Sequence, residues 1–133
     1  MTRPLSILIA DDYDDNRVLL RLMLEAAGYT VFEARDGREC IETALRAVPD
    51  VALVDLSMPV VDGWEVLREL RADARTHNLL CIAVTAFAGD EDQQRALDAG
   101  FNAYIIKPYR SKDLLDLVTR LLADETHDGE QSL

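Results

Sequence analysis

Five short strand-like segments alternate with five segments in which apolar residues recur at helical spacing. The strand-like segments cover residues 5–10, 30–34, 51–54, 80–84 and 102–106. Each is followed by a stretch whose apolar residues lie three or four positions apart, which is the period of a helix that packs on one face. Apolar strands flanked by amphipathic helices are typical of a parallel sheet covered on both faces. We therefore predict a single (βα)5 domain of the α/β class.

The first and the last of the predicted helices each carry a clear stripe of apolar residues. The first stripe precedes Gly28, a helix stop signal. It consists of Val18, Leu19, Leu22, Met23 and Ala26. The stripe of the last helix consists of Leu114, Leu115, Leu117 and Val118. We expect this last stripe to pack on the core; the alternative is that its edge is exposed and binds a partner.

Length, charge and cysteine content narrow the class of protein. The 133 residues suit one domain, and the net charge of −11 argues against nucleic-acid binding, because a phosphate backbone is bound through clustered Lys and Arg. Cys40 and Cys81 form no CxxC pair, which favours a reduced intracellular setting. No run approaches about 18 apolar residues, the length of a membrane span. We expect a cytoplasmic protein without membrane insertion.

Polar groups that suit a phosphate or a metal stand where four of the strands end. Asp11 and Asp12 follow the first strand, Asp55 the third, Thr85 the fourth and Lys107 the fifth. In a parallel α/β sheet, ligands bind outside the carboxyl ends of the strands, so these groups are expected to converge. Carboxylate oxygens suit Mg²⁺, and a lone carboxylate can act as a nucleophile toward phosphorus. The hydroxyl and the ammonium are suited to binding phosphoryl oxygens.

Taken singly, each of these groups has an ordinary structural explanation. The acidic run from Asp11 to Asn16 suits the start of a helix, where carboxylates favour the positive end of the dipole. Asp55 alone suits a loop, Thr85 a helix cap, and Lys107-Pro108 a turn. Their order and spacing within one five-unit pattern favour a common site instead.

As a set, these segments resemble the receiver domain of bacterial two-component response regulators, of a stand-alone chemotaxis-like or phosphorelay-like kind. The resemblance covers roughly residues 5–123 and rests on short matching segments. They are Asp11-Asp12, Val54-Asp55-Leu56-Ser57-Met58-Pro59, Asp62-Gly63, Val84-Thr85-Ala86, Tyr104 and Lys107-Pro108. It implies a flavodoxin-like, doubly wound sheet of strand order 2-1-3-4-5.

The resemblance also implies a chemistry for the site. Asp55 would accept a phosphoryl group from a histidine kinase or phosphotransfer protein in a Mg²⁺-dependent step. Asp12 and Asp55 would contact Mg²⁺ directly, Asp11 would act mainly through water, and the backbone carbonyl of Ser57 would complete the protein ligands. Thr85 and Lys107 would bind the phosphoryl oxygens. Such a domain catalyses only its own phosphorylation and dephosphorylation and is not classed as an enzyme.

A switch is implied at Thr85 and Tyr104. Phosphorylation adds charge and strong acceptors beside Thr85. Movement of the Thr85 hydroxyl toward the phosphoryl group would shift the following loop, and the ring of Tyr104 would turn inward, changing the binding of a downstream protein target. The alternative is that Tyr104 is simply a half-buried strand aromatic.

Two other functions and two features of chain organisation stay open. A phosphatase of the haloacid-dehalogenase type would need a second Asp two residues after Asp55. That position is Ser57, which argues against a phosphatase. A pseudo-receiver that binds partners without phosphorylation would typically lack one of the site residues. We expect residues 1–124 to form the receiver and residues 125–133 a polar, disordered tail. The chain is a stand-alone receiver or part of a larger protein, and Met1 favours the former.

Overall fold

Five parallel strands alternate with five helices. The computed structural model describes the backbone of residues 4–131 and the side chains as far as residue 124. In chain order the elements are β1 (Ser6–Ala10), α1 (Asp14–Ala26), β2 (Thr30–Ala34), α2 (Gly37–Ala47), β3 (Val51–Asp55), α3 (Gly63–Ala72), β4 (Leu80–Thr85), α4 (Asp90–Ala99), β5 (Ala103–Ile106) and α5 (Ser111–Gln131). The sheet order is β2-β1-β3-β4-β5, which confirms the predicted doubly wound topology.

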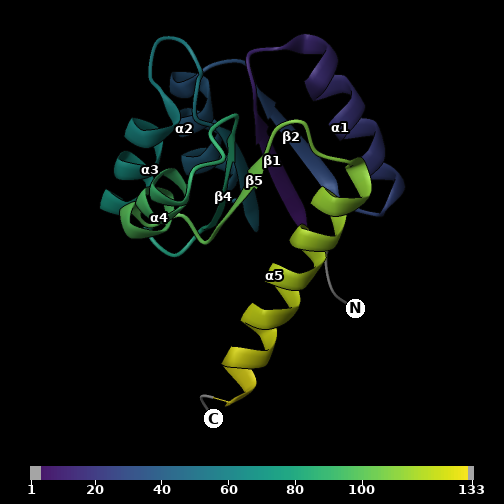
Figure 1. Cartoon of the computed structure of the whole chain (residues 1–133). Coiled ribbons are helices and arrows are strands. Elements are labelled where there is room, and N and C mark those ends of the chain that lie inside the picture. The colour runs from purple at the N-terminus through teal and green to yellow at the C-terminus, as the bar shows by residue number, and fades with distance from the viewer. Residues whose placement is uncertain (1–3, 132–133) are drawn as a thin grey trace.

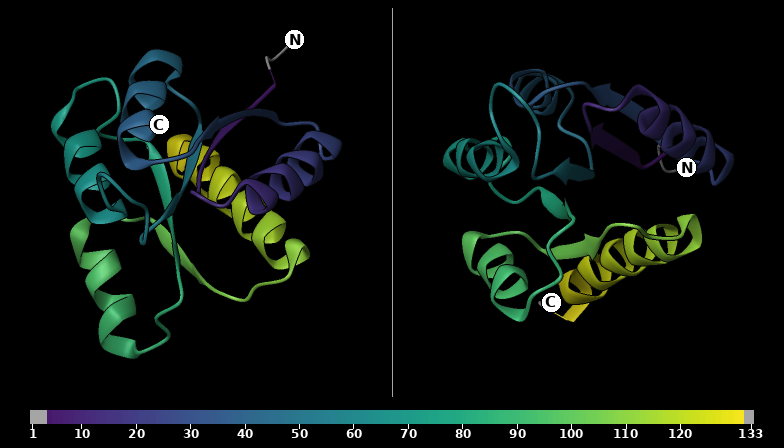
Figure 2. Two further views of the ribbon diagram at one scale, coloured as in Figure 1. Left: turned by 90° about the horizontal axis from the view of Figure 1, so that it is seen from above. Right: turned by 45° about the horizontal axis from the view of Figure 1, so that its top comes forward.

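Helices cover both faces of the sheet. Figures 1 and 2 show α1 and α5 on one face and α2, α3 and α4 on the other. Two apolar clusters correspond to these faces, one containing Cys40, Leu67 and Ala96 and the other Leu24 and Leu114. Strands β1, β3 and β4 are buried along their whole length. This burial on both sides explains why their sequences are continuous apolar runs rather than alternating ones.

The strand register brings the polar strand ends to one edge of the sheet. Ala10 of β1 pairs with Val54 of β3, and Asp55 pairs with Val84 of β4. Thr85 pairs with Ile106 of β5. The residues that follow these positions therefore leave the sheet at the same edge, from which the site is built.

Helix α1 is confirmed, but most of its predicted apolar stripe is exposed rather than packed against the sheet. Its buried residues are Arg17, Leu20 and Leu24. Leu19 and Leu22 are 67% and 55% exposed. Apolar residues surround much of this helix, so periodicity predicts the helix but does not choose which of two overlapping stripes is buried. The way the chain leaves β1 decides which stripe meets the sheet.

Helix α5 packs on the core and runs further than expected. Leu114 and Val118 are fully buried, and Leu115 and Leu117 are half-buried against the same cluster, in agreement with the core interpretation. The helix continues to Gln131 and extends beyond the sheet in Figure 1, whereas disorder was expected from residue 125. The side chains of residues 125–131 and the whole of residues 132–133 lie outside the described part. Within residues 4–131, no helix is both long enough and apolar enough to cross a bilayer.

A close approach of α2 to the β3–α3 loop places one glycine under a steric constraint. Gly37 follows the N-cap Asp36, whose side chain accepts a hydrogen bond from the backbone N–H of Glu39. A Cβ atom at Gly37 would lie 1.9 Å from the backbone oxygen of Val61. No side chain larger than hydrogen fits there without moving the loop, and this loop connects β3 to α3 beside Asp55.

We predict that Gly37→Ala lowers the free energy of unfolding by roughly 1–3 kcal/mol, the usual cost of overpacking. The comparison is Arg38→Ala at the next, exposed position of α2, for which a change within about 0.5 kcal/mol is expected. Urea denaturation followed by circular dichroism measures both. Equal stability of Gly37→Ala and the wild type would show that the loop yields without cost.

Candidate functional site

Three carboxylates meet at the carboxyl edge of the sheet. Asp11 and Asp12 follow β1, and Asp55 ends β3. One oxygen from each of the three lies within 4.8 Å of the others. Asp11 and Asp55 are buried, at 4% and 3% exposure, whereas Asp12 is open to solvent. The strand-end pattern predicted this convergence, and the three oxygens form a hard donor set of the kind that Mg²⁺ prefers.

Asp55 has a different partner on each of its carboxylate oxygens. Its Oδ1 accepts a hydrogen bond from the backbone N–H of Ser57 at 2.8 Å. Its Oδ2 accepts one from the Lys107 ammonium at 2.7 Å, which is also an ion pair. Lys107 is anchored in turn, because its backbone N–H donates to the carbonyl of Thr85 at 2.7 Å. Its peptide bond to Pro108 is cis. The carboxylate is thus held in one orientation at the end of its strand.

The acidic site carries unbalanced negative charge. Burial raises the pKa of Asp11, and the neighbouring charge of Asp55 adds to the rise; a hydrogen bond from the backbone N–H of Tyr13 opposes it. Burial, together with the charges of Asp11 and Asp55, also raises the pKa of Tyr109 to about 12. Lys107 supplies one positive charge against three carboxylates. A bound cation would relieve this repulsion, so the residues present fit Mg²⁺.

Thr85 and Tyr104 lie on neighbouring strands but have separate local partners. Thr85 is buried, and its hydroxyl oxygen accepts a hydrogen bond from the backbone N–H of Phe87 at 3.0 Å. Tyr104 is half-buried, and its hydroxyl donates to the side-chain oxygen of Gln93 on α4. The Gln93 amide also donates to the carbonyl of Ala88 at 3.0 Å. Gln93 therefore joins Tyr104 to the loop that follows Thr85.

The metal role of the Ser57 carbonyl remains a prediction. The described contact of Ser57 with the site is through its backbone N–H, which bonds to Asp55. The roles of Asp11, Asp12, Asp55, Thr85 and Lys107 in metal and phosphoryl binding are likewise predictions, although the structure brings their side chains to one edge.

Two residues near the site escaped the sequence analysis. Arg17 donates from Nη1 to the backbone carbonyl of Asp11 at 2.7 Å. A signal existed, because Arg17 shares the helical spacing of Leu20 and Leu24 and is therefore a cation on a buried face. Gln93 offered no comparable signal, because an amide on a polar helix is ordinary and its partner lies eleven residues away.

Comparison with known proteins identifies the family. Residues 7–119 match the response regulator receiver domain, so the chain belongs to the response regulator receiver family of two-component signalling. It is 36% identical to the polar-differentiation response regulator DivK of Brucella anthropi over 91% of this chain and 98% of that protein. Receiver domains are signalling modules rather than conventional enzymes.

Solved structures of the same fold are similar along nearly their whole length. The chemotaxis response regulator CheY4 of Vibrio cholerae has a TM-score of 0.84 at 29% identity, covering 89% of this chain and 98% of CheY4. The receiver domain of the sensor histidine kinase PA1611 from Pseudomonas aeruginosa has a TM-score of 0.80 at 33% identity, covering 89% of this chain and 97% of that domain. That domain holds a magnesium ion coordinated in its active-site cleft.

We predict that Asp11→Asn stabilises the metal-free fold at neutral pH. The pKa of Asp11 is raised above the ordinary value of 3.8, so its ionised form opposes folding. This cost is complete above the folded-state pKa and absent below the unfolded one. The advantage of Asp11→Asn in urea denaturation with EDTA should therefore be present at pH 7 and vanish as the pH falls below the usual aspartate range.

Magnesium should reduce this advantage of Asp11→Asn over wild type. At ten times its dissociation constant, a ligand stabilises the native state by about 1.4 kcal/mol. Wild type should gain this amount, and Asp11→Asn should gain less because it has lost a carboxylate of the donor set. An equal gain in both proteins would exclude Asp11 from metal binding.

Proposed function

We propose that this protein is a phospho-acceptor switch in which Asp55 receives a phosphoryl group from a histidine kinase or phosphotransfer protein. The observation that carries the proposal is the environment of Asp55: a buried carboxylate, fixed on one oxygen by Lys107 at 2.7 Å, with oxygens of Asp11 and Asp12 within 4.8 Å. The family supports it, and the magnesium in the PA1611 receiver supports the cation.

The transfer follows from this arrangement. A carboxylate oxygen of Asp55 attacks the phosphorus of a phosphohistidine, a P–O bond forms, the P–N bond breaks, and the imidazole leaves with the electron pair and takes up a proton. Asp12, Asp55 and the carbonyl of Ser57 would hold Mg²⁺ directly, with Asp11 acting mainly through water, and the bound cation would supply positive charge against the transferring oxygens. The Lys107 ammonium already lies on Asp55 and donates to a phosphoryl oxygen after transfer.

The switch begins at Thr85. Its hydroxyl accepts from the Phe87 amide and keeps its own proton free to donate to a phosphoryl oxygen. A shift of Thr85 moves the loop containing Ala88, and Gln93 links that loop to Tyr104. Phosphorylation thus biases the position of Tyr104 and, through it, the binding of a downstream protein target.

Apolar surface beside the site supports a protein as phosphodonor. Leu19 and Leu22 are exposed on α1. A cavity of about 500 Å³ is lined by Leu19, Leu20, Lys107, Pro108 and Tyr109, with Asn16 and Ser111. Because Lys107 lines this cavity and also contacts Asp55, a partner seated on the apolar surface brings its reactive group to the acceptor.

The remaining parts of the proposal concern setting and extent. We place the receiver function in residues 1–124, in a cytoplasmic protein that inserts into no membrane and binds no nucleic acid. The net charge of −11 supports the last point.

The decisive experiment is Mg²⁺-dependent labelling by acetyl phosphate, read by intact mass. Wild type should gain one phosphoryl group, and Asp55→Asn none, since the amide is not a nucleophile. Asp62→Asn is the matched control: it makes the same chemical change at an exposed helix cap, and asparagine also caps the helix. It should be labelled like wild type. Folded wild-type protein that takes no label with Mg²⁺ present would contradict the proposal and favour a phosphorylation-independent binding module.

A second experiment tests the switch. Thr85→Ala should still be labelled at Asp55, but the amide shifts of Ala88, Gln93 and Tyr104 that accompany labelling in wild type should shrink, because the hydroxyl that couples the phosphoryl group to the loop is gone. Thr85→Ser keeps that hydroxyl and should restore the shifts in ¹H–¹⁵N spectra. Full-sized shifts in labelled Thr85→Ala would rule out this route.

A further inference from the structure

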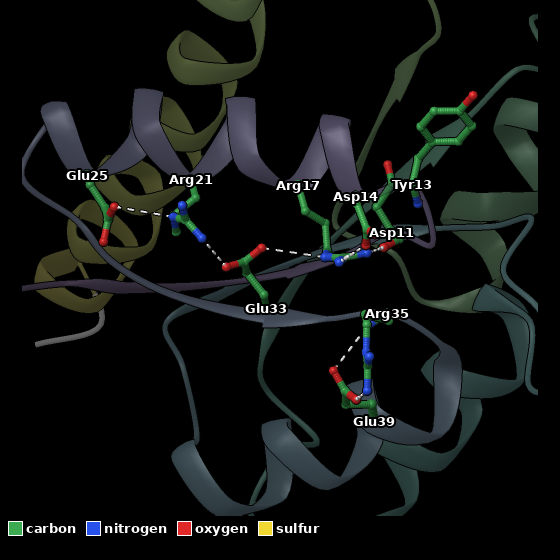
Figure 3. Close-up of polar contacts among 9 residues, drawn as sticks. All are labelled: Asp11, Tyr13, Asp14, Arg17, Arg21, Glu25, Glu33, Arg35 and Glu39. Atoms are coloured by element: carbon green, nitrogen blue, oxygen red, sulfur yellow. Dashed lines mark hydrogen bonds and ion pairs between the residues drawn. The ribbon is translucent and has the colours of Figure 1, made fainter.

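The buried guanidinium of Arg17 lies behind the carboxylate site. Only 8% of its side chain is exposed. Nη1 donates to the backbone carbonyl of Asp11 at 2.7 Å, and Nη2 donates to the carboxylate of Asp14. Nε lies 3.5 Å from a carboxylate oxygen of Glu33 on β2. Figure 3 shows this group between the start of α1 and the adjacent strand, with Asp11 at one end of the array.

The contact at Asp11 bears on the geometry of two metal ligands at once. The carbonyl of Asp11 belongs to the peptide that joins Asp11 to Asp12, so holding that oxygen fixes the plane of the peptide between the two carboxylates. The rest of Asp11 is also restrained. Its backbone N–H donates to the carbonyl of Ala34 at 3.1 Å, and its Oδ1 accepts from the backbone N–H of Tyr13 at 2.8 Å. Of these restraints, only the one from Arg17 acts on the peptide leading to Asp12.

We propose that Arg17 is a positioning residue for the metal site, which holds the Asp11–Asp12 peptide so that both carboxylates face Asp55. The inference rests on the proposed function, because it concerns the same Mg²⁺ ligands. A guanidinium suits the task, since its rigid fork donates in one plane to the Asp11 carbonyl and to the Asp14 carboxylate together, while its charge also pairs with Glu33. The site is then preorganised by a residue that touches neither metal nor phosphate.

An effect of Arg17 through its charge and an effect through its hold on the peptide would change the Mg²⁺ affinity in opposite directions. A cation near a metal site repels the metal, so if Arg17 acted only through its charge, its removal would tighten Mg²⁺ binding. If it acts by holding the peptide, its removal weakens binding. Asp14 and Glu33 neutralise much of its charge, which leaves the positional role as the larger effect. The sign of the change in Mg²⁺ affinity separates the two.

The same array provides a matched control. Arg21 lies one turn further along α1 and pairs with the other oxygen of Glu33 at 2.7 Å. It also lies 3.7 Å from Glu25 and is 36% exposed. Its described contacts are with Glu33 and Glu25, and they do not include the Asp11–Asp12 peptide. Arg21→Met therefore removes the same charge from the same ion-pair array without disturbing the metal ligands.

The experiment is an Mg²⁺ titration of the full chain without phosphodonor, followed through the amide shifts of the β1–α1 loop in ¹H–¹⁵N spectra. Arg17→Met should bind Mg²⁺ about 10-fold more weakly than wild type, the usual effect of losing a residue that orients metal ligands. Arg21→Met should stay within about twofold, since its charge is screened by solvent. Arg17→Lys keeps the charge but lacks the fork, and its affinity should fall between those of Arg17→Met and wild type.

The outcomes are distinguishable. Tighter or unchanged binding by a folded Arg17→Met would overturn the positional role, while leaving the proposed function intact. An equal loss of Mg²⁺ affinity in Arg21→Met would show that the effect comes from the ion-pair array as a whole, and it would also overturn the positional role of Arg17. If Arg17→Met does not fold, Arg17→Lys decides: weaker binding with an otherwise native spectrum supports the proposal, and wild-type affinity overturns it. Wild type that binds no Mg²⁺ would count against the proposed function itself.

Discussion

The site depends on how three carboxylates are held at one edge of a parallel sheet against their mutual repulsion. Two of them are buried, so water screens them poorly, and the raised pKa of Asp11 records the cost. The structure offsets that cost with one ammonium on Asp55 and with backbone donors from Ser57 and Tyr13. A bound divalent cation would neutralise the charge that remains. Affinity for a metal would then come at the expense of the stability of the metal-free fold.

A short series of hydrogen bonds connects Thr85 at the edge of the site with α4 and β5. The hydroxyl of Thr85 is already engaged by the loop that follows it, and Gln93 connects that loop to Tyr104. The contacts between Thr85 and α4 thus form a continuous series within a few residues. On the neighbouring side, Trp64 packs edge-on against Phe101, and the Arg95 guanidinium lies 4.4 Å from the centre of the Trp64 ring. These contacts join α3, α4 and the segment that leads into β5, so any movement of the loop after Thr85 would meet a packed surface.

Helix α1 serves the site from both of its faces. Its inner face carries Arg17 to the peptide between Asp11 and Asp12, and its outer face leaves Leu19 and Leu22 exposed beside the cavity at Lys107. The orientation of α1 about its own axis determines both the contact of Arg17 and the exposure of Leu19 and Leu22. A rotation that buried Leu19 would also withdraw the guanidinium from Asp11. The exposed apolar surface of α1 and the position of the Asp11–Asp12 peptide are therefore linked through a single rigid element.

The amino-acid sequence by itself determined the alternation of strands and helices and the polar residues at the strand ends, because both follow from local periodicity and from the parallel sheet that it implies. The strand order came from the resemblance to receiver domains, since alternation alone permits several orders. Which face of α1 meets the sheet, where Arg17 points and how Gln93 meets Tyr104 were decided only in the tertiary structure. Each depends on the angle at which a helix leaves its strand, or on a neighbour brought near by folding. The periodicity of apolar residues along the chain contains no information about that angle or about such neighbours.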